Sequence, residues 1–200
     1  MILVTYQAPD FTAPAVLNTG EIVNDFNLKT YISNTTSIIF FWPMDFTFIC
    51  PSELIACDKR HAEFKKRKVN VIGISGDSQY VHYAWRNTPI DQGGIGPIQY
   101  PMVADIKHEI MQAYGITHPK LGVALRATFL IDKQGFIRHQ LINDLPLGRN
   151  FDEIIRMIDA LQFHEKFGLV CPAQWKKDQE GMKASQSGVS QYLKKHIDKL

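Results

Sequence analysis

The chain has 200 residues, 45% of them hydrophobic, which is enough to bury a substantial core in one compact fold. Its 22 Lys and Arg nearly balance its 20 Asp and Glu, and the formal net charge of +2 comes without a long basic run, so nucleic acid is not an expected partner. The apolar runs are far shorter than a membrane span, and Met1–Val4 is too short for the apolar part of a secretion signal, so we expect a cytoplasmic protein that binds no membrane.

A cysteine at the start of a helix follows the first strongly predicted strand. Residues 37–42 form a short β-branched and aromatic run that ends at a proline, which predicts a buried strand. The residues after Cys50 predict a helix, and Pro51 is tolerated only in its first turn. One face of this helix carries residues at helical spacing: Leu54, Cys57, His61 and Phe64. Unpaired N–H groups and the positive end of the helix dipole favour a thiolate at Cys50, and the thiolate is the nucleophile.

The alternative for Cys50 is a small buried hydrophobe, the commoner role of a lone cysteine. The helix start, the adjacent proline and the nearby Thr47 hydroxyl together favour reactivity instead. Cys57 lies on the apolar face, so we interpret it as a core thiol, because apolar surroundings raise the pKa of a thiol. We interpret His61, on the same face, as a packed or satisfied histidine rather than a general base.

Strand and helix patterns alternate along the rest of the chain. Strands are predicted over residues 69–75 and 101–104, and a hairpin over residues 126–131 and 136–142 with a turn between them. Helices are predicted from a cap at Asp77 or Ser78, from residue 106 to a stop at Gly115, and from Asn150 to just before Gly168. We therefore expect an α/β protein with a central mixed sheet covered by helices.

No metal site is predicted. The seven histidines and three cysteines show neither the HExxH pattern nor the spacing of a zinc site. In a reducing compartment the cysteines are expected to be reduced, catalytic or metal-bound rather than locked in structural bridges. The glycine-rich residues 93–97 lack the Lys-Ser/Thr of a phosphate loop and predict a flexible turn, and the lysine-rich tail predicts a solvated helix.

Pro43, Thr47 and Cys50 form a pattern of Pro, three residues, Thr, two residues and Cys. This pattern resembles the peroxidatic motif of the peroxiredoxins. Residues 168–175, with Cys171, are similar to the resolving-cysteine segment of the typical two-cysteine subfamily, which includes the bacterial alkyl hydroperoxide reductase subunit. The similarity extends from residue 8 to residue 175.

The resemblance implies a thioredoxin-like fold with a C-terminal extension. It divides the chain into a peroxidatic domain over residues 1–167 and a resolving-cysteine segment and tail over residues 168–200. Arg126 matches the family's active-site arginine, although a surface arginine is the alternative on exposure alone. Glu53 and Arg149 match positions that orient this arginine, and Pro43 and Thr47 belong to the same site.

The activity implied by the resemblance is reduction of hydroperoxides without metal, haem or flavin. Cys50 would become a sulfenic acid and then form a disulfide with Cys171 of the other subunit of an antiparallel dimer, within a decamer of five dimers. A dithiol protein, thioredoxin or a flavoprotein disulfide reductase, would recycle the disulfide. Two other classes stay open: a thiol-disulfide exchange enzyme, which would be expected to carry CxxC, and a redox-regulated holdase.

The resemblance also bears on overoxidation. Gly93-Gly94-Ile95-Gly96 is close to a Gly-Gly-Leu-Gly element that sensitive members pair with a C-terminal Tyr-Phe. Here the tail reads Tyr192-Leu193, so one aromatic ring of the cover over the peroxidatic helix is missing. We therefore expect intermediate sensitivity to overoxidation.

Overall fold

The structure, a computed structural model, describes residues 1–199. The chain forms two compact units, Met1–Phe151 and Asp152–Leu200, which are described separately below. The functional division expected at residue 168 remains a prediction.

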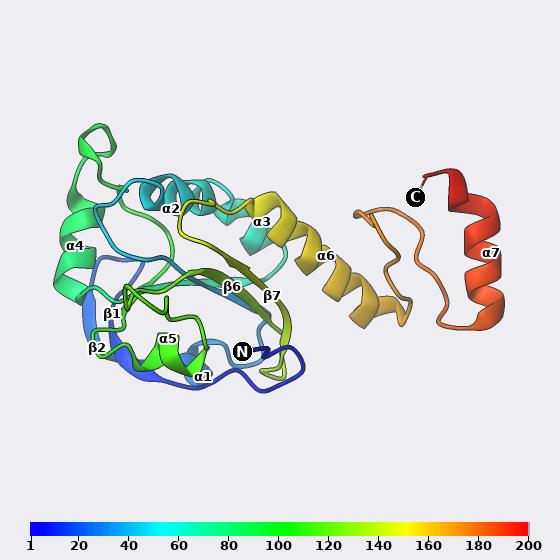
Figure 1. The fold of residues 1–200 in the computed structure, drawn as a ribbon, viewed down its shortest axis with the longest axis horizontal. Coiled ribbons are helices and arrows are strands. Elements are labelled where there is room, and N and C mark those ends of the chain that lie inside the picture. The colour runs from blue at the N-terminus through cyan, green and yellow to red at the C-terminus, as the bar shows by residue number, and fades with distance from the viewer. Residues whose placement is uncertain (200) are drawn as a thin grey trace. The chain divides into compact units, whose positions relative to one another are not determined.

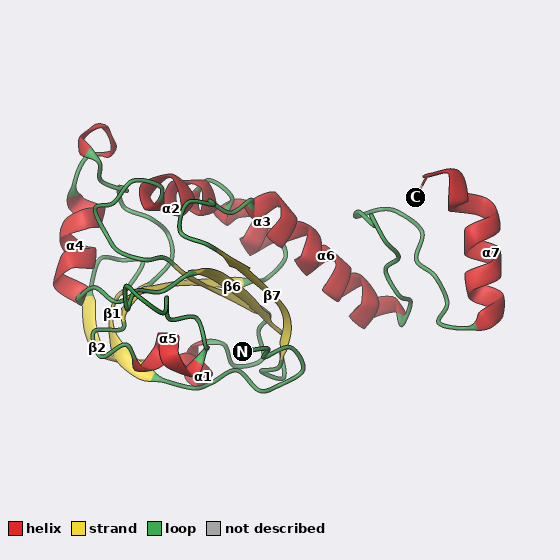
Figure 2. Cartoon of the chain, in the orientation of Figure 1, coloured by secondary structure: helices red, strands yellow, loops and turns green. Residues whose placement is uncertain are grey.

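The first unit is built on one seven-stranded sheet with the strand order β2-β1-β5-β4-β3-β6-β7 (Figures 1 and 2). β3 pairs parallel with β4 and β4 pairs parallel with β5, whereas the other neighbours are antiparallel. The predicted mixed sheet and α/β class are therefore confirmed. The strands are β1 (Thr12–Val16), β2 (Ile22–Asn27), β3 (Ser37–Phe41), β4 (Asn70–Ser75), β5 (Met102–Ala104), β6 (Arg126–Ile131) and β7 (Ile137–Asn143).

The central strand β3 is buried on both faces, as its apolar run predicts. Ile39 and Phe41 join the main apolar cluster on one face of the sheet. Phe40 points to the other face, where its ring contacts Trp42, Tyr100 and Phe151 at centroid distances of 5.5 to 5.7 Å. Because successive side chains of a strand alternate between faces, this one strand anchors both layers of the core.

Helices cover both faces of the sheet. In Figure 1, α2 and α3 lie on one side of it and α1 and α5 on the other. The α-helices of the first unit are α1 (Leu28–Tyr31), α2 (Cys50–Asp58), α3 (His61–Lys66), α4 (Gln79–Asn87) and α5 (Glu109–Ala113), and a 3-10 turn, η1 (Ile90–Gln92), follows α4. The hairpin of β6 and β7 and the cap of α4 by the Ser78 side chain are as predicted.

Two predicted helices differ from the structure. The single helix predicted from Cys50 to Phe64 is two helices, because the chain leaves helical geometry at Arg60, which has a φ of −99° and a ψ of 6°. The guanidinium of Arg60 donates to the Ala56 carbonyl and so satisfies an acceptor at the end of α2. The helix predicted from residue 106 begins only at Glu109, because His108 takes a positive φ of 59°.

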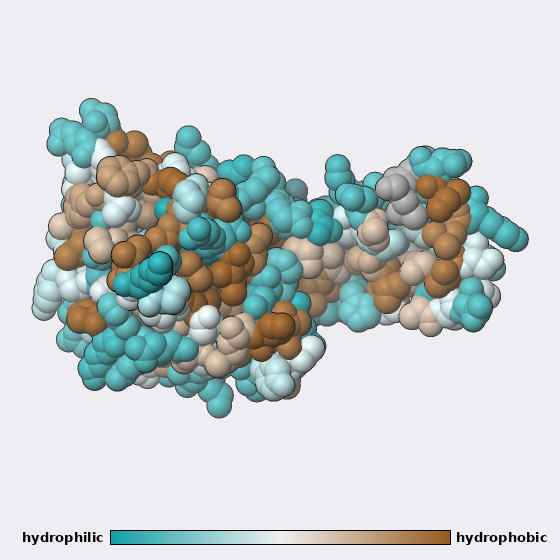
Figure 3. All heavy atoms as spheres, in the orientation of Figure 1, coloured by the Kyte–Doolittle hydropathy of each residue, from teal (hydrophilic) through white to brown (hydrophobic). Residues whose placement is uncertain are grey.

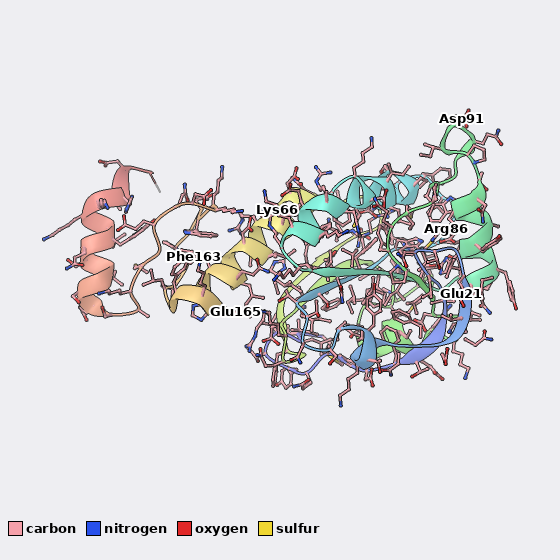
Figure 4. The ribbon with its side chains drawn as sticks, turned by 180° about the vertical axis from the view of Figure 1, so that it is seen from behind. Glu21, Lys66, Arg86, Asp91, Phe163 and Glu165 are labelled. Carbon is pink, nitrogen blue, oxygen red and sulfur yellow. The ribbon has the colours of Figure 1, made fainter. Side chains whose placement is uncertain are left out.

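The second unit begins in α6 (Phe151–Phe167), which ends before Gly168 as predicted. Val170 and Met182 then pair through two backbone hydrogen bonds and close the segment between them. Phe163, labelled in Figure 4, projects from α6, and its ring lies 4.9 Å from that of Trp175. The predicted tail helix is α7 (Gln186–His196), capped by the Ser185 side chain, and η2 (Ile197–Lys199) follows it; Leu200 lies outside the described residues.

Candidate active site

Cys50 is the first residue of α2 and has no exposed surface. Pro51 lies in the first turn, as expected, and the N-cap residue Ile49 makes no side-chain capping bond. The backbone N–H groups of this turn are therefore not satisfied by a cap side chain, and the helix dipole places positive charge next to the sulfur. This environment suits a sulfur that carries negative charge.

Thr47 and Arg126 both reach the sulfur. Thr47 Oγ1 lies 2.9 Å from Cys50 Sγ, and Arg126 Nη1 lies 3.3 Å from it. Arg126 opens β6, as the sequence places it, but it is only 4% exposed, so the alternative of a surface arginine is wrong. Burial lowers the pKa of Arg126, but the hydrogen bonds and charges of Cys50 and Glu53 have a larger opposite effect. The pKa of Arg126 is therefore raised, and its guanidinium stays charged.

Glu53 holds Arg126 from the same helix that carries Cys50. One carboxylate oxygen of Glu53 accepts from Arg126 Nη1 and from Arg149 Nη2, both at 2.8 Å. The other accepts from Arg149 Nε and from the Arg149 backbone N–H, both at 2.8 Å. Burial raises the pKa of Glu53, yet these hydrogen bonds and charges outweigh it and hold the pKa below its ordinary value.

Arg149 connects this carboxylate to the sheet. Its Nη1 donates to the carbonyl oxygens of Phe41 and Ala127, at the ends of β3 and β6. Its guanidinium also lies 5.2 Å from the ring centre of Phe40. The carbonyl groups of β3 and β6 therefore fix the position of Arg149. Arg149 fixes the Glu53 carboxylate, and this carboxylate orients Arg126 beside the sulfur.

The structure brings five of the expected site residues together in the first unit: Cys50, Thr47, Glu53, Arg126 and Arg149. Pro43 is half-buried and opens the loop that leads from β3 to Thr47. The roles of these residues in a reaction remain predictions.

Cys171 lies in the second unit, next to the pairing of Val170 with Met182. Its Sγ donates to the Ala160 carbonyl on α6 at 3.5 Å. Burial raises the pKa of the Cys171 thiol, and the nearby Arg156 guanidinium opposes that rise. Arg156 is held in place by Glu153 and by the Trp175 carbonyl.

Cys57 and His61 are the two uncertain members of the predicted apolar helix face. Cys57 is fully buried and burial raises its pKa well above the ordinary value, which confirms a core thiol. His61 opens α3 and is half-buried, as a packed histidine would be, and its buried Nδ1 has no hydrogen-bond partner among the described residues.

Within residues 1–199 no group of three or more His, Cys, Asp or Glu side chains is arranged to hold a metal ion. No helix in this range is both long and apolar enough to cross a membrane.

Sequence reasoning missed a buried polar network behind the loop that precedes Cys50. Asp45 is 4% exposed; its carboxylate accepts a hydrogen bond from Trp42 Nε1 and pairs with His82 Nδ1, and its backbone N–H donates to the Asp77 carboxylate. Only the position of Asp45 inside the recognised motif hinted at it. Trp42 directly follows β3, Asp77 lies between β4 and α4, and His82 lies in α4, so their proximity depends on the fold.

The sequence matches the model of the AhpC/TSA family over residues 4–140 and the model of the C-terminal domain of 1-Cys peroxiredoxin over residues 160–195. It is 60% identical to alkyl hydroperoxide reductase C of Buchnera aphidicola (subsp. Acyrthosiphon pisum), covering 98% of this chain and 100% of that protein. It is 52% identical to alkyl hydroperoxide reductase C of Helicobacter pylori (strain ATCC 700392 / 26695), covering the whole of both chains.

Solved structures of similar proteins come from the same groups, the 2-Cys peroxiredoxins and AhpC. The reduced 2-Cys peroxiredoxin of Plasmodium vivax superposes with a TM-score of 0.93 at 44% identity, covering 97% of this chain and all of that one. AhpC of Enterococcus faecalis superposes with a TM-score of 0.78 at 35% identity, covering 86% of this chain and all of that one.

Proposed function

The chain belongs to the AhpC/TSA family, and from this premise we propose that Cys50 is its peroxidatic cysteine and Cys171 its resolving cysteine. The protein is a peroxiredoxin, a thiol-dependent peroxidase with a thioredoxin-like fold. The observation that carries the assignment of Cys50 is the position of its sulfur, within hydrogen-bond distance of both the Thr47 hydroxyl and the Arg126 guanidinium.

In the first step the Cys50 thiolate attacks the terminal oxygen of a hydroperoxide. The S–O bond forms while the O–O bond breaks, the cysteine becomes a sulfenic acid, and the leaving oxygen takes up a proton to give alcohol or water. Negative charge moves from the sulfur to the leaving oxygen. Arg126, held by Glu53, is placed to stabilise negative charge on the Cys50 sulfur before the reaction and on the leaving oxygen as the O–O bond breaks.

In the second step the Cys171 thiolate attacks the sulfenic sulfur, an S–S bond forms, and water leaves. Disulfide geometry requires Cα atoms about 4.4 to 6.8 Å apart. Because Cys50 has no exposed surface, the first turn of α2 must unwind before Cys171 reaches it. A dithiol reductant, thioredoxin or a flavoprotein disulfide reductase, then returns both cysteines to thiols with two electrons.

We propose that Cys171 comes from the partner subunit of an antiparallel homodimer and that five dimers form a decamer in the cytoplasm. Support for an interface near the site comes from the apolar side chains left exposed beside Cys50: Phe48 is 97% and Phe46 51% exposed. On the face drawn in Figure 3, apolar residues lie among hydrophilic ones. A related Plasmodium yoelii Prx1a, modified at its N-terminus, forms an artifactual octamer.

Peroxide consumption with competing reductants tests the proposal. Wild type should consume hydrogen peroxide and an organic hydroperoxide when supplied with thioredoxin or with a flavoprotein reductase, and Cys50→Ser should consume neither. Disulfide exchange without peroxide consumption would instead identify a thiol-disulfide exchange enzyme. Protection of an unfolding client by Cys50→Ser would support a holdase role.

A further inference from the structure

The peptide unit between Met44 and Asp45 is held on both sides by side chains. Its N–H donates to Asp77 Oδ2 at 2.8 Å, and its carbonyl oxygen, on Met44, accepts from Thr47 Oγ1 at 2.8 Å. The peptide is planar and trans, so the directions of its N–H and its C=O are coupled. A carboxylate that fixes this N–H therefore also fixes the acceptor for the Thr47 hydroxyl.

Asp77 is itself held in one orientation. Ser75, at the end of β4, donates its hydroxyl to the same Asp77 oxygen at 2.7 Å, and the Asp77 N–H donates to the Ser75 hydroxyl at 3.1 Å. Ser75 has no exposed surface and Asp77 is half-buried. The carboxylate is thus anchored to a buried strand end rather than to a mobile loop.

The side chain of Asp45 fixes the other end of the same peptide. It accepts from Trp42 Nε1 at 2.8 Å and pairs with His82 Nδ1 at 2.7 Å, and neither side chain of the Asp45–His82 pair has exposed surface. His82 Nε2 lies 3.1 Å from the Val103 carbonyl, which can only accept, so this nitrogen carries a proton. Asp45 is therefore clamped through both its side chain and its backbone.

Thr47 has one hydroxyl proton and two neighbours within reach. Its Oγ1 lies 2.8 Å from the Met44 carbonyl and 2.9 Å from Cys50 Sγ. The Met44 carbonyl and a Cys50 thiolate both only accept, so they compete for this proton. A carbonyl held firmly in place takes the proton and leaves a lone pair of Oγ1 facing the sulfur side. The terminal oxygen of a hydroperoxide keeps its proton as it is attacked, and such a lone pair can accept a hydrogen bond from it.

Building on the proposed function, we propose that Asp77 is a positioning residue for peroxide reduction. It holds the Met44–Asp45 peptide so that the Thr47 proton points to the Met44 carbonyl and the Thr47 lone pair receives the O–H of the hydroperoxide beside Cys50. Asp77 touches neither the sulfur nor the substrate and acts only through this peptide and Thr47.

The test is the second-order rate constant for the reaction of reduced full-length protein with hydrogen peroxide, measured by competition with a reporter peroxidase. Asp77→Ala removes the acceptor and should lower the constant about 3- to 10-fold, the effect of one directed hydrogen bond. Asp77→Asn keeps an acceptor oxygen and should stay within about twofold of wild type. In a Thr47→Val background, Asp77→Ala should cause no further loss, because the hydroxyl to be oriented is gone.

Ser78→Ala is the matched control, because it removes the N-cap of α4 next to Asp77 without touching the Met44–Asp45 peptide. It should lower the melting temperature and leave the rate constant unchanged. Asp77→Ser, too short to reach the Asp45 N–H, replaces Asp77→Ala should that variant not fold.

An unchanged constant in Asp77→Ala, an equal loss in the Thr47→Val background, or failure of Asp77→Asn to restore the rate would each overturn the inference. Absence of peroxide consumption by wild type would instead overturn the proposed function, so the two failures are distinguishable.

Discussion

Glu53 is a buried carboxylate placed between two buried guanidinium groups. Breaking a buried ion pair by removing one charge is expected to cost about 3 to 5 kcal/mol. Glu53→Gln should therefore lower the free energy of unfolding by an amount of this order at neutral pH. The contacts to Arg126 and Arg149 are both affected, so peroxide reactivity should fall as well.

The pH dependence of this effect has a definite sign. The folded-state pKa of Glu53 is lowered, so its contribution to stability is fully present above the ordinary value of 4.5 and is lost as the pH falls through the folded pKa. Urea unfolding of wild type and Glu53→Gln at pH 7, 4 and 3 should show a difference that shrinks with acid. A difference that stays constant across this range would rule out an ionised, stabilising Glu53.

Arg126 is expected to contribute directly to reactivity. A single directed charge in a dry site is typically worth about 3 kcal/mol, so Arg126→Ala should lower the rate of Cys50 oxidation about 100-fold with the fold retained. Arg138→Ala is the matched control, because that arginine is 41% exposed and pairs with Asp132 on the hairpin. Stopped-flow measurement of the rate of Cys50 oxidation in both variants provides the test. Equal rates in the two variants would show that Arg126 does not contribute to the reactivity of Cys50.

The residues of the site were predictable to different degrees. Pro43, Thr47 and Cys50 lie within eight positions of each other, and their spacing alone marks the motif. Asp45, Asp77 and His82 carried no such signal, because their contacts join separate elements. A contact between Asp45 and Asp77 depends on how β3 and β4 align in the sheet, and local sequence patterns do not determine that alignment.

At the scale of elements, α2 carries Cys50 and is the helix whose first turn is proposed to unwind. The Tyr100 hydroxyl donates to the Leu54 carbonyl at 2.9 Å inside the core, and Cys57 one turn later has no exposed surface. We expect these contacts to confine unwinding to the first turn and to keep the rest of the helix folded.

This confinement predicts the reactivity of Cys57. Burial holds its pKa well above the ordinary value of 9.0, so iodoacetamide at neutral pH should not label Cys57 in the reduced protein or in the Cys50–Cys171 disulfide form. Peptide mass spectrometry with and without urea provides the measurement, and urea should expose the thiol. Labelling of Cys57 in the folded disulfide form would mean that the whole of α2 opens.

The elements themselves show what sequence patterns can predict. The strong apolar runs gave β3, β4 and the β6–β7 hairpin, and the tail helix was also found. Among the strands and α-helices, those without a prediction were β1, β2 and α1, since β1 contains Pro14 and alanines and β2 contains exposed polar residues. The break at Arg60 was missed because neither glycine nor proline marks it.

At the scale of the whole molecule, the tail is expected to influence overoxidation. Tyr192 lies on α7, where its ring is 4.4 Å from that of His196, and the neighbouring Leu193 is 38% exposed. An aromatic contact is worth about 0.5 to 1.5 kcal/mol, so its absence should favour disulfide over sulfinic acid about 2- to 10-fold. Leu193→Phe should therefore raise the sulfinic acid yield at Cys50, and deletion from Tyr192 onward should lower it.

Mass spectrometry of Cys50 across a peroxide titration compares these two variants with wild type. The deletion serves as the opposite control to Leu193→Phe, since the first removes the aromatic residue of the expected cover and the second supplies the missing ring. Identical sulfinic acid yields in all three proteins would show that the tail does not control access to α2.

Cys50 is proposed to take the peroxide oxygen, and Cys171 of a second subunit to remove it as water. The most direct measurement is intact and peptide mass spectrometry of wild type and Cys171→Ser after stoichiometric hydrogen peroxide, with dimedone present to trap sulfenic acid. Wild type should form covalent dimers linked from Cys50 to Cys171, and Cys171→Ser should carry one trapped sulfenic acid, located at Cys50. Oxygen located at Cys57, or a disulfide formed only within one chain, would contradict the account.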